Sequence, residues 1–177
     1  MITLVTGGAG NGKSYFAENL CNGLPGPKYY LAAMIPFGPD SEKRIEKNQK
    51  ARAEYGYETI EKYTDIHEVE LTQKGNVLLE CLCNLTANEM YDEAGNITDP
   101  VEKIVSGIKH LAPQCENLII VTNDVGGDAV FYDEKSRAYV VALGKINEEV
   151  SNMADEVIEV VCGIPLTLKG KHEGGVQ

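Results

Sequence analysis

The sequence has no apolar stretch that approaches the roughly 20 residues a membrane-spanning helix requires. It also shows no signal peptide, because glycines follow the short apolar segment at residues 2–5 almost at once. Basic residues are scarce, with 16 Lys and Arg against 27 Asp and Glu and a formal net charge of −11. This balance argues against nucleic acids and anionic membranes as main partners, since both require clustered Lys and Arg. We therefore expect a cytoplasmic protein without an integral membrane segment.

Metal-binding patterns of cysteine and histidine are also missing. The five cysteines are an odd number without a C-x-x-C pair, so we expect reduced and mostly buried thiols. Only three histidines occur, at positions 67, 110 and 172. With 177 residues the chain is long enough for one domain with a substantial core.

What the sequence does contain is an alternation of apolar segments and amphipathic ones. We expect strands at 2–6, 29–33, 57–61, 77–82 and 118–122, and two more around Gly163 within 156–169. Helices are expected at 14–21, from about 40 to 52, from Asp99–Pro100 to Leu111, and through Tyr139 to Met153. The pattern predicts an α/β fold: a single P-loop NTPase-like three-layer domain over 1–169, with a mainly parallel sheet, an antiparallel C-terminal edge and a disordered tail at 170–177.

The segment Gly7-Gly-Ala-Gly-Asn-Gly-Lys-Ser14 lies between the first strand and the first helix and fits the P-loop pattern in full. Small residues let backbone N–H groups turn toward phosphate oxygens, and the helix N-terminus adds partial positive charge. Lys13 would then contact the β- and γ-phosphates, and the Ser14 hydroxyl would bind Mg²⁺. The loop predicts a nucleotide site, but it does not specify the reaction.

Acidic and amide side chains follow two of the apolar strands. Glu80 comes after Val77-Leu78-Leu79, where P-loop proteins carry an acidic residue close to magnesium. Asn123 and Asp124 follow the strand at 118–122, and the carboxyl ends of parallel strands build the sites of open α/β sheets. We expect Glu80 in the site as a second magnesium ligand, and leave Asn123 and Asp124 open between a site role and loop capping.

Several stretches together resemble the bifunctional adenosylcobinamide kinase / adenosylcobinamide-phosphate guanylyltransferase family of cobalamin biosynthesis. T-G-G-A-G-N-G-K-S at 6–14 is similar to the family's T-G-G-x-x-S-G-K-S, and L-L-E-C-L at 78–82 to its L-L-E-C-I/L. V-T-N-D-V-G at 121–126 resembles V-T-N-E-V-G, and Y-L-A-A at 30–33 resembles Y-I-A-T. Further likenesses are found at Arg44, Arg52, 57–61, Asn88, Arg137, Gly144, Asn147, 154–157, Gly163 and Lys169.

The resemblance implies two activities on one P-loop domain. The first is phosphorylation of the aminopropanol hydroxyl of adenosylcobinamide by ATP or GTP with Mg²⁺. The second is transfer of GMP from GTP to that phosphate through a guanylylated histidine. It also implies a homotrimer with sites near the subunit boundaries.

Site residues follow from the same resemblance. Lys13 and Glu80 carry over as catalytic residues, and Ser14 and Glu80 as metal ligands. The nucleotide-binding positions are Gly7, Gly8, Ala9, Gly10, Asn11, Gly12, Lys13, Ser14, Ala32, Ala33, Met34, Gln49, Lys50, Ala51, Arg52, Glu61 and Glu80.

The sequence departs from the family at the guanylylated histidine, whose position is occupied by Asn48. An amide nitrogen is delocalised into its carbonyl group and cannot serve as this nucleophile. His67 is a candidate replacement, but the sequence favours a surface or packing role for it. After Arg137 the family's second Arg and Asp are also replaced, by Val140 and Val141.

Two alternatives to the full bifunctional enzyme therefore stay open. One is a P-loop kinase that phosphorylates another small alcohol. The other is a nucleotide-binding regulatory module without turnover.

Overall fold

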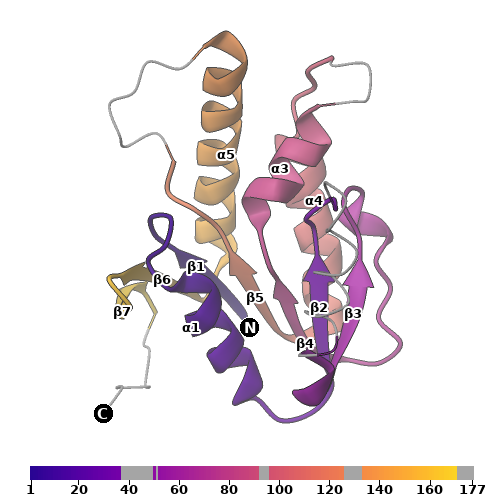
Figure 1. Cartoon of the computed structure of the whole chain (residues 1–177). Coiled ribbons are helices and arrows are strands. Elements are labelled where there is room, and N and C mark those ends of the chain that lie inside the picture. The colour runs from indigo at the N-terminus through magenta and orange to yellow at the C-terminus, as the bar shows by residue number, and fades with distance from the viewer. Residues whose placement is uncertain (37–49, 51, 92–95, 126–132, 171–177) are drawn as a thin grey trace.

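The structure is a computed structural model in which residues 1–36, 50, 52–91, 96–125 and 133–170 are described. A seven-stranded sheet in the order β3-β2-β4-β5-β1-β6-β7 forms its centre (Figure 1). The strands are β1 (Ile2–Thr6), β2 (Lys28–Ala32), β3 (Tyr57–Glu61), β4 (Gly75–Leu79), β5 (Cys115–Val121), β6 (Glu156–Val161) and β7 (Ile164–Lys169). All neighbouring strands are parallel except β6 and β7, which pair antiparallel at the edge.

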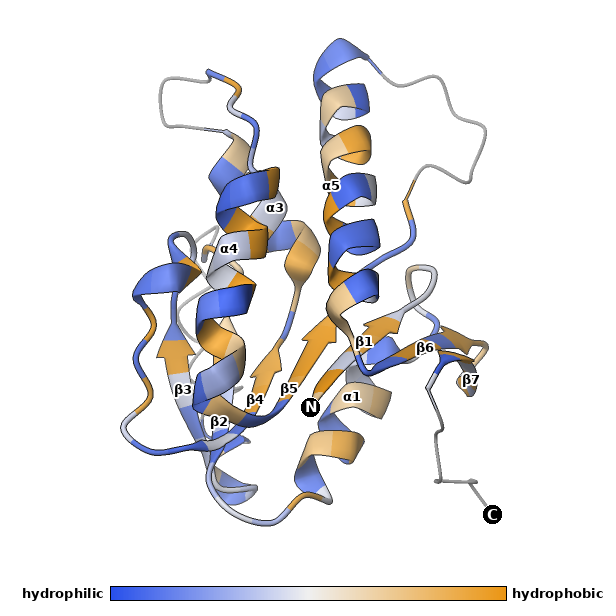
Figure 2. Cartoon of the chain, turned by 180° about the vertical axis from the view of Figure 1, so that it is seen from behind, coloured by the Kyte–Doolittle hydropathy of each residue, from blue (hydrophilic) through white to orange (hydrophobic). Residues whose placement is uncertain are grey.

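Helices cover both faces of the sheet, which confirms the three-layer α/β fold. They are α1 (Lys13–Asn22), α3 (Leu82–Met90), α4 (Val101–Leu111) and α5 (Glu134–Met153), with short 3₁₀ turns η1 (Ile66–Glu68) and η2 (Ala112–Gln114). One apolar cluster joins α1 to the sheet through Ala17, Cys21 and Val5. The larger cluster lies on the opposite face beneath α3, α4 and α5 (Figures 1 and 2). Within the described ranges, no helix combines the length and apolar character needed to span a bilayer.

The boundaries of the elements follow from local chemistry. All five residues of β4 are buried, as expected for an interior strand of a parallel sheet. The Asp99 carboxylate accepts the N–H of Val101 at 3.1 Å, and Asp133 accepts that of Ser136 at 2.7 Å. These bonds satisfy free N–H groups in the first turns of α4 and α5.

The segment after β4 corrects one prediction. We expected the strand to continue to Leu82, but it ends at Leu79, and Leu82 is the first residue of α3. The Cys81 sulfur accepts the N–H of Asn84 at 3.4 Å and caps this helix. The helix could not be predicted from the sequence, because it has only nine residues and the apolar residues at its start continue the apolar pattern of the preceding strand.

Other expectations fall partly outside the described residues. Of the helix expected from about 40 to 52, only Lys50 and Arg52 are described, and both are helical. The expected tail at 170–177 likewise lies outside them, except for Gly170. The predicted buried thiols are confirmed for Cys21, Cys83 and Cys115, whereas Cys162 is exposed.

Candidate nucleotide site at the phosphate loop

The loop between β1 and α1 has a backbone that depends on glycine. Gly7, Gly10 and Gly12 have φ angles of 139°, 74° and 89°, which residues with a side chain rarely adopt. At Gly7 a β-carbon would lie 2.4 Å from the carbonyl oxygen of Val160 on β6. The N–H of Phe16 donates to the Gly12 carbonyl at 3.0 Å, so the loop leads directly into the helix. Its backbone can therefore close around an anion at the N-terminus of α1.

The β6–β7 hairpin supports this loop from the side. Cys162 and Gly163 form its turn with φ angles of 52° and 80°. The Gly163 N–H donates to the Asn11 carbonyl at 3.0 Å, and a β-carbon on Gly12 would lie 3.6 Å from the Gly163 α-carbon. The antiparallel edge of the sheet thus fixes the phosphate loop in place.

Lys13 is buried with its ammonium group turned back into the loop. Its Nζ donates to the Gly8 carbonyl at 2.7 Å. Burial lowers the pKa of Lys13, and the neighbouring thiols of Cys83 and Cys81 partly oppose that shift. Ser14 follows at the exposed start of α1, where its hydroxyl suits a hard cation that prefers oxygen ligands.

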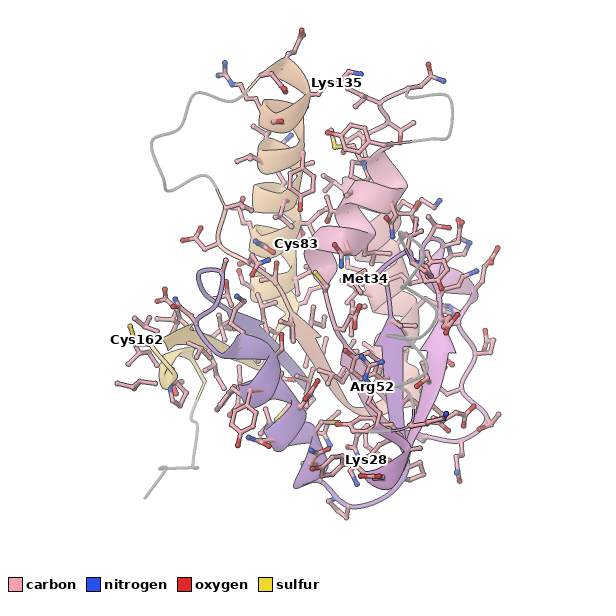
Figure 3. The ribbon with its side chains drawn as sticks, in the orientation of Figure 1. Lys28, Met34, Arg52, Cys83, Lys135 and Cys162 are labelled. Carbon is pink, nitrogen blue, oxygen red and sulfur yellow. The ribbon has the colours of Figure 1, made fainter. Side chains whose placement is uncertain are left out.

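Glu80 is part of a partly buried polar network next to β2. The Tyr30 hydroxyl donates to Glu80 Oε2 at 2.5 Å, and Arg52 Nη2 lies 3.7 Å from the same oxygen. The guanidinium group of Arg52, which is labelled in Figure 3, also stacks 3.4 Å from the centroid of the Tyr30 ring. Burial and the adjacent Glu80 carboxylate raise the pKa of Tyr30, so this hydroxyl stays protonated and acts as a donor. The structure therefore brings together the two predicted site residues Glu80 and Arg52, and sequence reasoning missed Tyr30 as their link.

A hollow of about 280 Å³ opens beside this network, between α1 and the strands β2 and β3. Tyr15, Tyr30, Tyr55 and Tyr57 supply aromatic walls, and Arg52 borders the same space. Flat aromatic faces of this kind stack well on planar rings.

The segments that follow β2 and β3 are held together by Asn88 of α3. Its Nδ2 donates to the carbonyl of Ala33 at 2.7 Å and to that of Tyr63 at 2.9 Å. Ala33 is buried and Met34 is exposed. At the end of β3, Glu61 accepts a hydrogen bond from the Tyr63 hydroxyl at 3.0 Å. Asn88 thus links the predicted nucleotide-contacting segment 32–34 to the backbone two residues after Glu61, a further predicted contact.

Two cysteines at the start of α3 lie close to Lys13, and sequence reasoning missed them. Cys83 Sγ accepts the N–H of Asn123 at 3.3 Å and lies 3.9 Å from Thr122 Oγ1. A hydrogen bond from Cys81 lowers the pKa of Cys83 to about 6, against the opposing effect of burial, and the pKa of Cys81 is raised. The C-x-C spacing after a strand was the available signal.

The remaining predicted residues are placed as follows. Asp124 is exposed after β5, and its N–H donates to the Gly7 carbonyl at 3.3 Å. Lys50 is exposed on its helix, and Asn48, Gln49 and Ala51 lie outside the described residues. In the part of the chain that the structure describes, no three His, Cys, Asp or Glu side chains gather as metal ligands.

The model of the family "Cobinamide kinase / cobinamide phosphate guanyltransferase" matches residues 3–168, which is nearly the whole chain. The chain belongs to this family. Its match includes the phosphate loop, Glu80, Asn88 and most of the β6–β7 hairpin.

Members of the family from three bacteria align with this chain over nearly its full length. The "Bifunctional adenosylcobalamin biosynthesis protein CobU" of Escherichia coli K12 is 30% identical, covering 96% of this chain and all of that protein. The protein of the same name from Salmonella typhimurium LT2 is 28% identical over the same shares. A "Bifunctional adenosylcobalamin biosynthesis protein CobP" from Pseudomonas aeruginosa is 26% identical, covering 97% of this chain and 99% of that protein.

Solved structures support the fold alone, because their sequence identity is low. A prototypical ATPase from the type III secretion system of pathogenic bacteria has a TM-score of 0.55 at 13% identity, covering 94% of this chain and 56% of that one. A protein from Pyrococcus horikoshii has a TM-score of 0.52 at 10% identity, covering 97% and 87%. This member of the cobinamide kinase family thus shares its overall fold with these two solved structures.

Proposed function

We propose that this protein transfers the γ-phosphoryl group of ATP or GTP, as its Mg²⁺ complex, to the aminopropanol hydroxyl of adenosylcobinamide. The observation that carries the proposal is a glycine-dependent phosphate loop with an inward-facing Lys13, in a chain that matches the cobinamide kinase family from residue 3 to 168. The relatives named as bifunctional adenosylcobalamin biosynthesis proteins support the corrinoid substrate and the pathway.

The proposed step is a direct transfer between two oxygens. The acceptor hydroxyl oxygen forms a bond to the γ-phosphorus while the bond to the bridging oxygen breaks, the nucleoside diphosphate leaves, and the hydroxyl proton passes to solvent. Loop N–H groups and the Lys13 ammonium would offset the charge on the transferring group. Lys13 would exchange its bond with the Gly8 carbonyl for one with phosphate oxygen.

Ser14 and Glu80 differ in how they fit the proposed magnesium site. The Ser14 hydroxyl stands at the start of α1, next to the phosphate-binding backbone. The Glu80 carboxylate already accepts the Tyr30 hydroxyl and pairs with Arg52, so a role through bound water suits it better than direct ligation. Magnesium held by these residues would supply positive charge that offsets the charge of the triphosphate.

The decisive test incubates the purified protein with adenosylcobinamide, Mg²⁺ and either triphosphate. Mass spectrometry is expected to find the corrinoid heavier by one phosphoryl group. Lys13→Ala should lower this turnover by about a hundredfold or more, because it removes a charge aimed at the transferring group. If no phosphorylated corrinoid forms with either nucleotide, the proposed activity is wrong.

We further propose that guanylyl transfer is weak or lost in this protein, because Asn48 replaces the family histidine. The described histidines offer no replacement that contacts the loop: His67 is exposed on η1, and His110 lies 3.2 Å from Glu70 at the end of α4. With GTP and Mg²⁺, the intact mass is expected to show no GMP adduct, and Asn48→His should create one. An adduct on the unaltered protein would contradict this and identify the nucleophile.

A second candidate is phosphorylation of a different small alcohol. The changes at Asn48, Val140 and Val141 favour it, since they fall where the family's pattern is otherwise charged or nucleophilic. Turnover of a metabolite panel, measured beside adenosylcobinamide, distinguishes the two candidates. Activity restricted to a non-corrinoid alcohol would favour the second.

The proposed enzyme is a homotrimer. Besides the family resemblance, the edge strand β7 exposes the apolar side chains of Ile164 and Leu166, which do not line the hollow between α5 and this strand. Light scattering should give three times the chain mass, and a monomer mass would refute the trimer.

A further inference from the structure

A hollow beside the phosphate loop lies on the sheet face opposite α1. It has a volume of about 620 Å³ and lies between α5 and the strands β1, β6 and β7. We name it the α5 cavity and define it by Thr6, Thr122, Asp124, Ser151, Glu159 and Lys169 among its lining residues. In Figure 2 the lower end of α5 reaches the sheet near the tips of β5 and β1, and β6 and β7 lie to one side of it.

The α5 cavity reaches the base of the phosphate loop. Thr6 is the last residue of β1 and is followed directly by Gly7. Asp124, which follows β5 and also lines the cavity, donates its backbone N–H to the Gly7 carbonyl at 3.3 Å. A molecule in this cavity would therefore lie next to the loop that is proposed to hold the triphosphate, but on the other side of β1 from α1.

Fixed hydrogen bonds keep one wall of the α5 cavity rigid. Thr122 Oγ1 donates to Asn147 Oδ1 at 2.7 Å, and Asn147 Nδ2 donates to the Asn123 carbonyl at 3.3 Å. Thr122 is buried, so this bond is shielded from water. The wall is thus ordered before any ligand arrives, which reduces the entropy lost on binding.

The charge that the α5 cavity presents is negative. Asp124, Glu148 and Glu159 line it, and none of their carboxylates has a hydrogen bond or ion pair among the described residues. Among the described lining residues the single cation is Lys169, and its Nζ already donates to the carbonyls of Ser151 and Asn152 at 2.9 and 3.0 Å, at the C-terminal end of α5. Three carboxylates disfavour a second phosphate-bearing ligand here.

We propose that the α5 cavity binds the acceptor of the phosphoryl transfer and selects a cationic, carboxamide-rich molecule. This inference rests on the proposed function. A corrinoid fits this chemistry, because its cobalt centre leaves the molecule positively charged and its rim carries primary amides that donate hydrogen bonds to carboxylates. The exposed Leu168 supplies apolar contact area for the edge of the macrocycle, and the buried Leu4 and Val157 lie beneath it in the cavity wall. The cavity is smaller than a whole corrinoid, so it would take the edge that carries the aminopropanol arm.

The test compares Glu159→Gln, Asp124→Asn and the double variant with Glu156→Gln, a matched control on the same strand that does not line the cavity. The KM for adenosylcobinamide should rise about tenfold in each single variant and further in the double variant, as expected for the loss of a charge-assisted hydrogen bond. The Kd for the nucleotide, measured by calorimetry, should stay within about twofold. Ser151→Phe, which fills the cavity from α5, should raise the same KM while nucleotide binding shows that the protein is folded.

The outcomes separate the two proposals. If the unaltered protein phosphorylates the corrinoid and the double variant keeps its KM, the acceptor site is wrong and the proposed function stands. A change in oligomeric mass without a change in KM would assign the cavity to a second copy of the chain and would likewise overturn the inference. If the unaltered protein converts no corrinoid, the proposed function fails and the inference fails with it.

Discussion

At the scale of single residues, the phosphate loop shows how backbone shape restricts the sequence. Gly7 combines a φ of 139° with a close approach to β6, whereas Gly8 has an ordinary φ and meets only the side chain of Asn11. The P-loop pattern fixes a glycine at position 7 but leaves position 8 free. The structure explains this difference, because a side chain at Gly7 would collide with the backbone of a neighbouring strand.

Gly7→Ala is expected to destabilise the protein by about 2 kcal/mol and to abolish measurable nucleotide binding, since the new methyl group displaces β6 or the loop. Gly8→Ala is the matched control and should change stability by less than about 1 kcal/mol, because the Asn11 amide can move aside. Urea denaturation and calorimetry measure the two effects. Equal losses for both variants would contradict the argument.

Cys83 predicts a pH dependence of stability. Its folded pKa of about 6 lies below the ordinary thiol value of about 8.5, so the thiolate contributes stability that is fully present above pH 8.5 and is lost as the pH falls through 6. Between these values the free energy of unfolding should therefore rise with pH, and Cys83→Ser should flatten the rise. The control is Cys162→Ser, which changes an exposed thiol. Ultraviolet thiolate absorbance that titrates only near pH 8.5 would refute this assignment.

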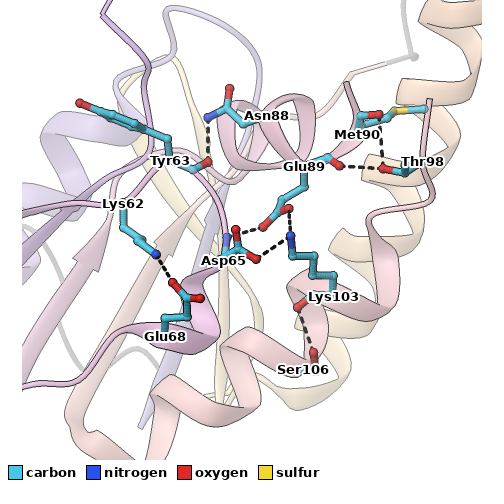
Figure 4. Close-up of polar contacts among 10 residues, drawn as sticks. All are labelled: Lys62, Tyr63, Asp65, Glu68, Asn88, Glu89, Met90, Thr98, Lys103 and Ser106. Atoms are coloured by element: carbon cyan, nitrogen blue, oxygen red, sulfur yellow. Dashed lines mark hydrogen bonds and ion pairs between the residues drawn. The ribbon is translucent and has the colours of Figure 1, made fainter. Parts of the chain in front are cut away.

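At the scale of elements, one polar cluster joins α3, α4 and the segment before η1 (Figure 4). The Lys103 ammonium lies 2.7 Å from Asp65 and 2.6 Å from Glu89, and the Asp65 N–H donates to the other oxygen of Glu89 at 2.5 Å. The Glu89 side chain is only 3% exposed, so its charge depends on these partners. The cluster holds the start of η1, which follows the β3 end of the candidate site, against two helices.

Lys103→Met should lower the free energy of unfolding by roughly 2 kcal/mol, a value discounted from that of a fully buried pair because Lys103 is 43% exposed. The hydrogen bond with Lys103 lowers the pKa of Asp65, and the same bond raises that of Lys103. The pair therefore contributes to the free energy of unfolding between about pH 4 and about pH 10. This contribution is lost at lower pH as Asp65 is protonated and at higher pH as Lys103 is deprotonated. Chemical denaturation measures the change, with Lys109→Met on the exposed face of α4 as the control. A loss no larger than that of the control would show that the cluster is not stabilising.

Element boundaries could be predicted from sequence where the signals are local. Strands β1 and β3 match their predicted ranges, because short apolar or β-branched runs end there at glycines or charges. The helix α3 could not be predicted in the same way. Its cap is a sulfur atom, and its packing depends on α4 and α5, which lie far along the chain.

At the scale of the whole molecule, the sheet order places the phosphate loop and the α5 cavity, the two proposed substrate sites, near the carboxyl end of β1. The phosphate loop leaves β1 toward α1, and the α5 cavity opens on the opposite face between α5 and the β6–β7 hairpin. This hairpin contacts the loop at Asn11 and also contributes Glu159 and Lys169 to the cavity. Binding at either site should therefore stabilise the same region of the molecule.

The Mg²⁺ complexes of ATP or GTP are expected to raise the melting temperature, because a ligand that binds only the folded state stabilises it by mass action, by about 2.7 kcal/mol at a hundredfold excess over Kd. Lys13→Ala should remove most of this shift. Scanning calorimetry of the unaltered protein and of Lys13→Ala, each with and without nucleotide, measures the shift in melting temperature. A folded protein that shows no shift at millimolar nucleotide would contradict the phosphate site, on which the proposed function depends.

The sequence by itself determined the phosphate loop, the α/β class and the antiparallel edge, because these depend on spacing within one short segment or on the order of successive segments. Only the tertiary structure decided that Arg52, Tyr30 and Glu80 form one network, that Asn88 joins two backbone segments, and that carboxylates of β6 and of the segment after β5 share a cavity with α5. Asn88 and Ala33, for example, are 55 residues apart in the chain. Distances between such groups follow from strand order and helix packing, which no local pattern encodes.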